Sequence, residues 1–375
     1  MVTAFMGLSR ELLSTRWSLL LIFTLTALFA QFKEGMSTAQ LIVWFVICGL
    51  GLIPLARMVS EMVEALADRL GDRIGGLVSV ALGNLVELVV SFSALAGGLY
   101  QLVVTSVAGA VITNCLLILG VSTVLAARKD PYIDIHPHSS SLQSQQLLVS
   151  TVVLIVPTIF FSRHKEMMTD GSNHFDSFAL YSVVVSALIL GFYLLSFLYQ
   201  LGTARSLYVR EEAKDVLPPV GEKRPMAVLI GLLLIISLLL VGVSENLVDS
   251  LQLLVDESHL NPLFVGLFLL PLFGSFSEGL VAIKAATSKR MDLAMTSTVE
   301  SSVQLLLFVL PLLVICGVSM SRFLHLAFPS EALFCMGATV LAVYWITENR
   351  KLSWYEGTLL LTLYAVMALG SLLLG

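Results

Sequence analysis

The chain has 375 residues and a formal net charge of −5. Hydrophobic residues make up 57% of it and charged residues 13%, and the mean hydropathy is +0.92. Soluble globular domains carry about a quarter charged residues, so this composition excludes that class and predicts an all-α polytopic membrane protein. The sequence contains no phosphate-binding loop, Ser/His/Asp set or basic nucleic-acid patch, so we expect a non-enzymatic protein without a nucleic-acid partner.

The cysteine pattern gives no sign of a disulfide framework or a zinc site. All four cysteines lie within apolar runs and none has CxxC spacing: Cys48, Cys115, Cys316 and Cys335. They are therefore interpreted as small core residues, and we expect no bound cofactor.

Eleven apolar runs are long enough to cross about 30 Å of hydrocarbon. In chain order they cover residues 17–32, 39–60, 74–100, 102–127, 146–162, 177–201, 226–255, 262–286, 293–320, 327–347 and 354–374. The first run follows Arg10 and Arg16, so a cleaved signal peptide is an alternative there and would leave the other ten runs unchanged. About eleven transmembrane helices are therefore expected.

The basic residues predict the orientation. With the N-terminus in the cytoplasm, the outer segments hold four of the 21 basic residues, and the remaining 17 lie inside, as the positive-inside rule requires. Those four are Lys33, Arg163, Lys165 and Arg322. We therefore expect an integral protein of the cell (inner) membrane, surrounded by lipid, with a cytoplasmic N-terminus and a C-terminus outside.

A polar segment at residues 202–225 divides the chain into two halves. It carries charges and paired prolines and is expected to be a cytoplasmic linker. Residues 1–38 then hold one extra N-terminal helix, and residues 39–201 and 226–375 hold five helices each. An odd number of spans per half gives the halves opposite senses in the membrane, which is the inverted-repeat architecture of many transporters.

Two acids occupy matching places in these halves. Glu87 lies four residues after Gly83 in the third run, and Glu278 lies four residues after Gly274 in the eighth. A carboxylate at bilayer depth costs about 2.5 kcal/mol or more and so marks a functional site by default. We expect the two acids to share one cation site.

Polar neighbours extend this candidate site. Asn84, Glu87 and Ser91 are spaced to share one helical face, although such residues also serve as ordinary interhelical hydrogen-bond partners. Near Glu278, Pro271 removes a backbone donor and frees carbonyl oxygens. Carboxylates, amide oxygens and carbonyls are the ligands of hard cations such as calcium.

Further polar residues follow the two acids or lie in other spans, with Glu61 at the end of its span, Glu245 deeper in the seventh run and Glu300 deep in the ninth. Thr113 and Gln304 stand equally far beyond Glu87 and Glu278. Residues expected to orient the acids, or to form a proton or cation path, are Asn114, Glu61, Glu245, Glu300, Ser301 and Ser302. For Glu61, a solvated helix end is the alternative.

At these residues the sequence resembles the calcium/proton exchanger (CAX) family of the calcium/cation antiporter superfamily. The segment GNLVE at 83–87 is similar to the family's G-N-x-x-E motif, and GAVITNCLLILG at 109–120 is similar to the continuation of that repeat. The segments SENLVDS at 244–250 and RMDLAMTSTVESSVQ at 290–304 resemble second-half motifs. The resemblance covers residues 40–374 and implies Ca²⁺/H⁺ antiport.

Three positions depart from the family pattern, all in the second half. Ser275 stands where the family has Asn, Gly279 where many members have His, and Glu300 where the family has Gly. The resemblance therefore supports cation/proton exchange more strongly than it supports calcium as the cation.

The expected mechanism is competition between protons and a divalent cation for Glu87 and Glu278. Burial favours the protonated acids and an arriving dication favours the ionised ones, so the two occupancies exclude each other. Asn84, Ser275, Asn114 and Gln304 would supply neutral oxygens or orient the acids. Alternating exposure of the site would then export cytoplasmic cation as protons enter.

Two other functions stay open at this stage. A sodium-driven calcium/cation exchanger would use acids at the same repeat positions. An intramembrane hydrolase would also pair two acids, but the GxxxE contexts lack a recognisable catalytic aspartyl motif. Cation selectivity, stoichiometry and oligomeric state do not follow from the sequence.

Overall fold

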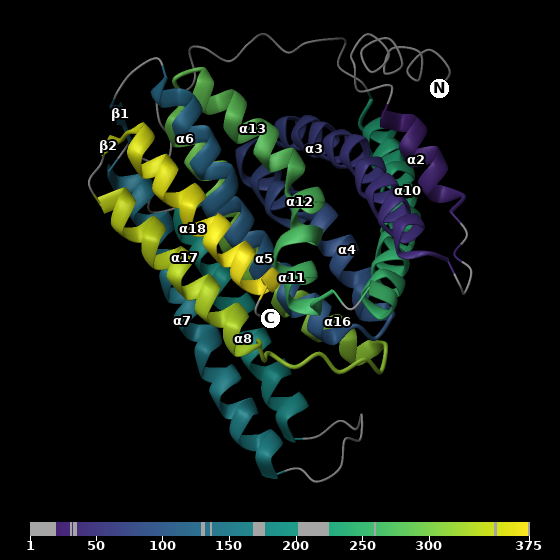
Figure 1. Ribbon diagram of the computed structural model, residues 1–375. Coiled ribbons are helices and arrows are strands. Elements are labelled where there is room, and N and C mark those ends of the chain that lie inside the picture. The colour runs from purple at the N-terminus through teal and green to yellow at the C-terminus, as the bar shows by residue number, and fades with distance from the viewer. Residues whose placement is uncertain are drawn as a thin grey trace. The chain divides into compact units, whose positions relative to one another are not determined.

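The fold was analysed in a computed structural model of the chain. It describes residues 20–30, 32, 36–128, 132–135, 137–167, 177–201, 225–258, 260–348 and 351–373. Residues 1–19 of the N-terminal segment and residues 202–224 of the expected linker lie outside this set. Nearly all of the described chain is helical, as the composition predicts (Figure 1).

The chain forms two compact units, and each unit takes helices from both halves of the sequence. The first unit comprises residues 1–93 and 197–259, and the second comprises residues 94–196 and 260–375. A helix in one half of the sequence therefore finds its packing partners in the other half as well as in its own.

The first unit is built on the long helix α3 (Thr38–Leu82), against which α2 (Leu20–Leu28) and α10 (Met226–Ser258) pack (Figure 1). The Thr24 hydroxyl donates to the carbonyl of Gly51 at 2.8 Å, and the Asn246 amide donates to the carbonyl of Ala27 at 2.8 Å. Gly71 interrupts α3 with φ 74°, a conformation that favours glycine. Most of α4 (Leu85–Ala96), up to Ser93, completes this unit.

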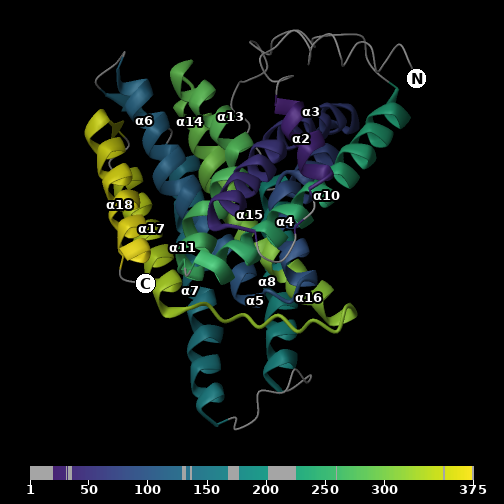
Figure 2. The ribbon, with the colours of Figure 1, turned by 45° about the vertical axis from the view of Figure 1, so that its right-hand side comes forward.

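The second unit has a buried central helix made of three consecutive elements. These are α5 (Tyr100–Ile112), the π-helical segment η2 (Thr113–Ile118) and α6 (Leu119–Ala127). Every residue from Val103 to Leu116 is buried. Helix α18 (Trp354–Leu373) packs along α6, and α17 (Ser330–Glu348) packs along α7 (Pro137–Met167), as both views of the ribbon show (Figures 1 and 2).

The remaining elements of the second unit form two interrupted helices, one complete helix and a small strand pair. The first interrupted helix runs through α11 (Pro262–Phe264), η4 (Val265–Leu269), α12 (Leu270–Gly274) and α13 (Phe276–Thr287). The second runs through α14 (Met291–Met295), η5 (Thr296–Glu300), α15 (Ser301–Gln304), η6 (Leu305–Val309) and α16 (Leu310–Ser319). The others are α8 (Ser177–Leu201) and the antiparallel strands β1 (Ile133–Asp134) and β2 (Lys351–Leu352).

All eleven apolar runs contain helix, but the count of eleven spans is not confirmed. Among the described residues, eight helices are long and apolar enough to cross a membrane, and nine if the bent pair Pro262–Gly274 and Phe276–Thr287 counts as one. Two runs are missing from the nine: the run at 17–32, where α2 has nine residues, and the run at 74–100, which is not one helix. The run at 74–100 breaks at Gly83–Asn84, which leaves α4 with only 12 residues.

Candidate cation site

Glu87 and Glu278, the two acids with the repeated Gly-x-x-x-Glu spacing, each lie in the first turn of a helix that begins at a break. In the first unit, α3 ends at Leu82 and α4 begins at Leu85, so Glu87 is the third residue of α4. In the second unit, α13 begins after Ser275 and Glu278 is its third residue. The chain bends by 61° at this break, between the helices Pro262–Gly274 and Phe276–Thr287. Two separate stretches of sequence thus produce the same local arrangement.

The backbone around the two breaks follows the same hydrogen-bonding pattern. The amide of Leu88 donates to the carbonyl of Asn84 at 3.0 Å, and the amide of Gly279 donates to the carbonyl of Ser275 at 3.1 Å. Asn84 and Ser275 therefore begin the two helices, each three residues before an acid. Asn or Ser followed by Glu three residues later is the spacing of a helix capping box.

In α13 this spacing does not produce a capping box. Ser275 makes no side-chain cap to the helix, although its hydroxyl is buried with the residue 1% exposed. The hydroxyl oxygen has no hydrogen-bond partner among the described residues. It therefore keeps its full capacity to donate to, or accept from, a group that enters the site.

The helix N-terminus also favours a negative charge on each acid. The first backbone N–H groups of a helix have no partner within it, and the macrodipole places partial positive charge at that end. Glu87 is buried and Glu278 is partly exposed. Each break therefore offsets part of the cost of holding a carboxylate in an apolar span.

Glu278 has close neighbours in the second unit. The Ser277 hydroxyl donates to Glu278 Oε2 at 3.0 Å, and the Ser297 hydroxyl donates to the Glu278 main-chain carbonyl at 3.4 Å. Ser297 belongs to η5, so the ninth apolar run packs on the eighth, as the sequence predicted.

Gly279 reflects close packing in the same region. A Cβ at this position would lie 3.3 Å from Ile118 Cδ1, at the end of η2. A histidine, which many members of the resembled family carry here, would require Ile118 to move. The Ile118 side chain thus fills the space that a side chain at position 279 would need.

Asn114 lies in η2 and is the most completely buried of the candidate neutral ligands. Its exposed fraction is 0%, and neither amide atom has a hydrogen-bond partner among the described residues. An unsatisfied buried amide carries a penalty of about 1–3 kcal/mol, so Asn114 is well suited to meet a ligand or a water molecule. π-Helical turns such as η2 are frequent at functional sites.

Ser302 has a different environment. Its hydroxyl donates to the carbonyl of Thr298 at 2.8 Å and lies 3.5 Å from the thiol sulfur of Cys115. These contacts join α15 to η2 within the second unit. The hydroxyl therefore has an evident structural role. Ser301, beside it, is also buried.

Glu300 and Gln304 are four residues apart on the second interrupted helix, and both are half-buried. Tyr193 on α8 is buried, and its ring lies 6.2 Å from that of Phe308 in η6, measured between centroids. Tyr193 was not singled out in the sequence, because a tyrosine in an apolar span gives no distinctive signal. Gln143 on α7 was missed for the same reason, and its amide donates to Thr296 Oγ1 at 3.3 Å.

Two acids of the proposed path lie at exposed positions of the first unit. Glu61 pairs with Arg57 at 2.8 Å across one helical turn, and both side chains are partly exposed. Glu245 is exposed on α10, one turn from exposed Asp249. Surface ion pairs of the Arg57–Glu61 kind contribute little to stability, about 0–1 kcal/mol. Among the described residues no group of three or more His, Cys, Asp and Glu side chains is arranged to hold a metal ion.

Comparison with known proteins identifies the family. The family model described as "Sodium/calcium exchanger protein" matches residues 40–202 and 228–373. The chain belongs to this family. The two matched ranges fall on either side of the polar segment at 202–225 and together cover most of the chain.

Relatives within the sodium/calcium exchanger family match over most of their length. A Ca(2+)/H(+) antiporter of Synechocystis sp. is 30% identical over 338 residues, which cover 87% of this chain and 89% of the relative. The Ca(2+)/H(+) antiporter ChaA of Bacillus subtilis is 28% identical, with 80% and 83% covered.

Solved structures share the fold. The structure of native YfkE matches with a TM-score of 0.72 and 27% identity, covering 88% of this chain and 92% of that one. The H⁺/Ca²⁺ exchanger CAX matches with a TM-score of 0.69 over 98% of this chain and 92% of that one. At 15% identity the second likeness shows the fold alone.

Proposed function

We propose that this member of the sodium/calcium exchanger family is a secondary antiporter that exchanges Ca²⁺ for H⁺ and exports cytoplasmic cation. The observation that carries the proposal is the pair of broken helices, each with an N-terminal Asn or Ser and an acid in its first turn. The choice of ions is supported by the relatives, since the Synechocystis and Bacillus subtilis proteins matched over most of their length are named Ca²⁺/H⁺ antiporters.

Glu87 and Glu278 are the acids on which protons and cation compete. A dication requires ionised carboxylates, and protonation removes that charge, so one occupant must leave before the other binds. Ser275 and Asn114 supply neutral oxygens, because both are buried with polar atoms not taken by other described residues. Asn84 and Gln304 complete the set of neutral groups. Calcium accepts such mixed oxygen ligands.

The other polar residues have supporting roles in this proposal. Glu61 and Glu245 are exposed acids and attract cations toward the membrane protein. Glu300 and Ser301 lie along the second interrupted helix and line a proton or cation path. Ser302 lies on the same helix, and its hydroxyl joins α15 to η2 through its contact with Cys115.

The two halves form inverted repeats of five helices, preceded by one extra helix. One family model matches two ranges of the chain, and the two helix breaks are equivalent. In addition, Thr113 follows Glu87 in the sequence by as many residues as Gln304 follows Glu278. These features support the repeat. Discontinuous helices in corresponding places of two repeats are typical of transporters that bind their substrate near the bilayer midplane.

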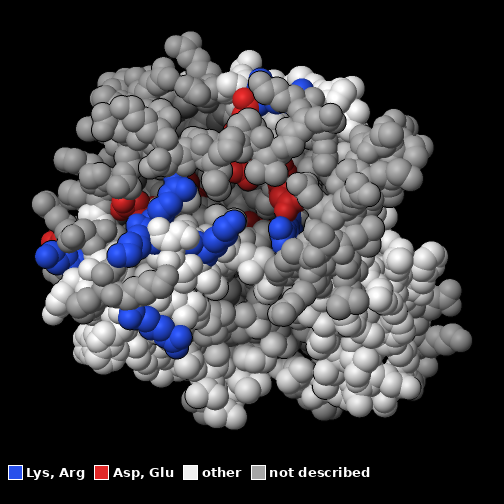
Figure 3. Space-filling model, turned by 90° about the horizontal axis from the view of Figure 1, so that it is seen from above, with Lys and Arg blue, Asp and Glu red and all other residues white. Residues whose placement is uncertain are grey.

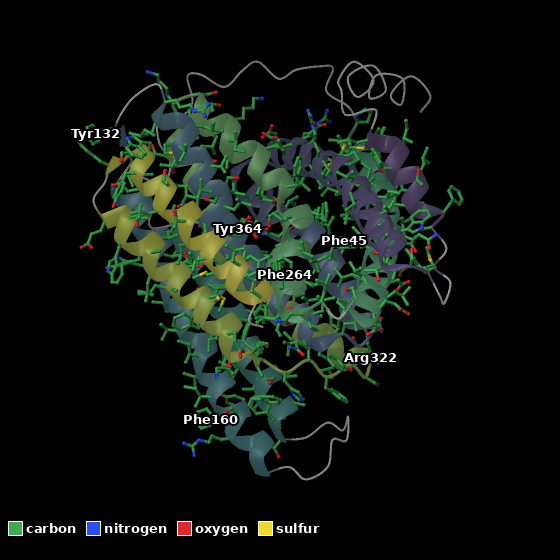
Figure 4. The ribbon with its side chains drawn as sticks, viewed as in Figure 1. Phe45, Tyr132, Phe160, Phe264, Arg322 and Tyr364 are labelled. Atoms are coloured by element: carbon green, nitrogen blue, oxygen red, sulfur yellow. The ribbon has the colours of Figure 1, made fainter. Side chains whose placement is uncertain are left out.

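The orientation follows from the second unit. Exposed Arg128, Lys284 and Lys289 lie at the ends of α6 and α13, and Figure 3 views this end and shows Lys and Arg side chains on its surface. Arg322 lies at the opposite end of the same unit (Figure 4). The basic end is cytoplasmic by the positive-inside rule, which places the C-terminus outside the cell membrane.

Transport by inside-out vesicles tests the proposal. An imposed pH gradient, acid inside, should drive Ca²⁺ uptake, and an imposed sodium gradient should not. Uptake driven by sodium alone would favour the sodium-driven alternative. Absence of uptake under either gradient from a folded protein would refute exchange.

A further inference from the structure

Gln143 on α7 is buried beside the second interrupted helix, and half of its amide is unused. The residue is 4% exposed, and its amide nitrogen donates to Thr296 Oγ1 at 3.3 Å. Its amide oxygen is also buried and has no hydrogen-bond partner among the described residues. Buried side-chain oxygens normally have a partner, so this oxygen is a candidate ligand for a group that is not part of the chain.

The helix that Gln143 contacts carries a polar stripe, which consists of Thr296, Glu300 and Gln304. The three residues are half-buried, and every residue between them except Ser297 is buried. Their four-residue spacing places them on one face of the helix. Polar and charged side chains that face lipid are costly, so we expect this face to meet polar groups or water inside the protein.

The contact with Gln143 shows which neighbour meets the polar stripe. Thr296 is the first residue of the stripe and of the π-helical segment η5, and α7 packs along both η5 and α15. The nitrogen and oxygen of an amide are bonded to the same carbon, so the bond to Thr296 also holds the Gln143 oxygen next to η5. Helix α7 therefore brings an amide oxygen to the side of η5 on which Thr296 and Glu300 lie.

The polar stripe begins beside Glu278 but faces another way. The hydroxyl of Ser297, the residue after Thr296, donates to the Glu278 main-chain carbonyl at 3.4 Å. Successive residues of a helix point in different directions, so Ser297 meets α13 while Thr296 meets α7. Glu278 and Gln143 thus lie on different sides of η5, and Gln143 belongs to a separate group of oxygen atoms.

We propose that Gln143, Thr296 and Glu300 form a second subsite for the transported divalent cation, between α7 and η5. The inference rests on the proposed function, in which Glu300 lines a proton or cation path. The subsite offers an amide oxygen, a hydroxyl oxygen and a carboxylate, and hard cations such as Ca²⁺ accept this mixture. Because affinity rises with the number of charged ligands, a single carboxylate makes the subsite weaker than a site with two acids, so a cation can leave it again.

A second glutamine of α7 provides a matched control. The amide nitrogen of Gln146 donates to Ser196 Oγ on α8 at 3.2 Å, so both glutamines join α7 to a neighbouring helix. Gln143 differs in that its amide oxygen is buried without a partner among the described residues. Methionine has the same unbranched shape as glutamine, and its soft thioether does not suit a hard cation. Gln143→Met and Gln146→Met therefore both lose a bond between helices, and the first also loses the proposed ligand.

The test measures Ca²⁺ uptake, driven by a pH gradient, in liposomes that contain the full chain. We expect Gln143→Met to raise the apparent KM for Ca²⁺ about tenfold, which corresponds to about 1.4 kcal/mol. Gln146→Met should keep the parent's KM, although its Tm should fall as that of Gln143→Met does, because each variant loses one hydrogen bond. An equal KM in the two variants would overturn the subsite and leave Gln143 as a residue that joins two helices.

Gln143→Glu tests the same site by adding charge. The Thr296 hydroxyl can donate to the new carboxylate, so the contact between α7 and η5 is kept. An additional charged ligand should lower the KM for Ca²⁺ below the parent's at alkaline pH, and protonation of that carboxylate should make the KM rise more steeply as the pH falls. A residue that only joins helices would not change the pH dependence. A KM equal to the parent's at every pH would therefore overturn the proposal.

A double-mutant cycle asks whether Gln143 and Glu300 hold the same cation. The effects of Gln143→Met and Glu300→Gln on the KM should be non-additive, because ligands of one ion share a partner. Additive effects would separate the two residues and overturn the subsite while the exchange function stands. A parent protein that exchanges no Ca²⁺ would instead refute the proposed function, and this inference with it.

Discussion

Gly109→Ala should push α5, the first part of the central helix, away from η4, the π-helical segment that precedes Glu278. A Cβ at Gly109 would lie 2.4 Å from the carbonyl oxygen of Leu267 and 2.7 Å from that of Gly266. Gly266 in turn faces Thr105, whose hydroxyl would lie 2.0 Å from a Cβ there. The crossing of α5 and η4 is therefore a contact of small residues, of the kind that lets membrane helices approach closely.

The cost of the substitution follows from these distances. Ordinary non-bonded contacts are about 3.5 Å, so the η4 backbone would have to move by roughly 1 Å. Over-packing of this kind costs about 1–3 kcal/mol, and we expect the upper end because the obstacle is backbone and cannot rotate away. The short helix α12 alone separates η4 from the break that precedes Glu278, so transport should fall together with stability.

Thermal unfolding in detergent and pH-driven Ca²⁺ uptake measure the two effects. Gly191→Ala and Gly337→Ala serve as controls, since a Cβ at either position would meet nothing within 4 Å. Both controls should unfold at or above the parent's Tm, because alanine favours helix more than glycine does. A Gly109→Ala protein with the same Tm and uptake as these controls would refute the packing argument.

Three further changes test the site. Glu87→Gln and Glu278→Gln should each abolish exchange in a protein that still inserts and unfolds normally, because the amide keeps the shape but loses the charge that a dication requires; near-parental uptake by either would exclude shared acids. Glu300→Gly should change the ranking of Ca²⁺ against Mn²⁺, Mg²⁺ and Na⁺ if Glu300 is a ligand, whereas weaker uptake at low salt with an unchanged ranking would make it an attracting charge on the path; competition assays at two ionic strengths distinguish these outcomes. Gly279→His should lower the free energy of unfolding by about 1–3 kcal/mol, the cost of displacing Ile118, and the Tm should fall with it. A Tm equal to the parent's would show that Ile118 moves aside without cost.

The sequence alone determined the class of the protein and the acids of its candidate site. Hydropathy is a property of consecutive residues, so apolar runs predict membrane helices without knowledge of the fold. The cost of a charge at bilayer depth is equally independent of tertiary contacts, which is why Glu87 and Glu278 stand out. The four-residue spacing of Glu300 and Gln304 likewise predicts a shared helical face, because a helix has a fixed period.

Only the tertiary structure decided how these helices are interrupted and which polar groups meet. The run at 74–100 reads as one continuous span, yet it breaks at Gly83–Asn84, where Gly83 itself has ordinary helical φ and ψ angles. The contacts of Cys115 with Ser302 and of Gln143 with Thr296 join residues far apart in the chain. An apolar side chain is equally suited to face lipid or the protein interior, so hydropathy does not tell which helices pack together. The packing partners depend on how closely two helices approach and on which side chains lie at their contact.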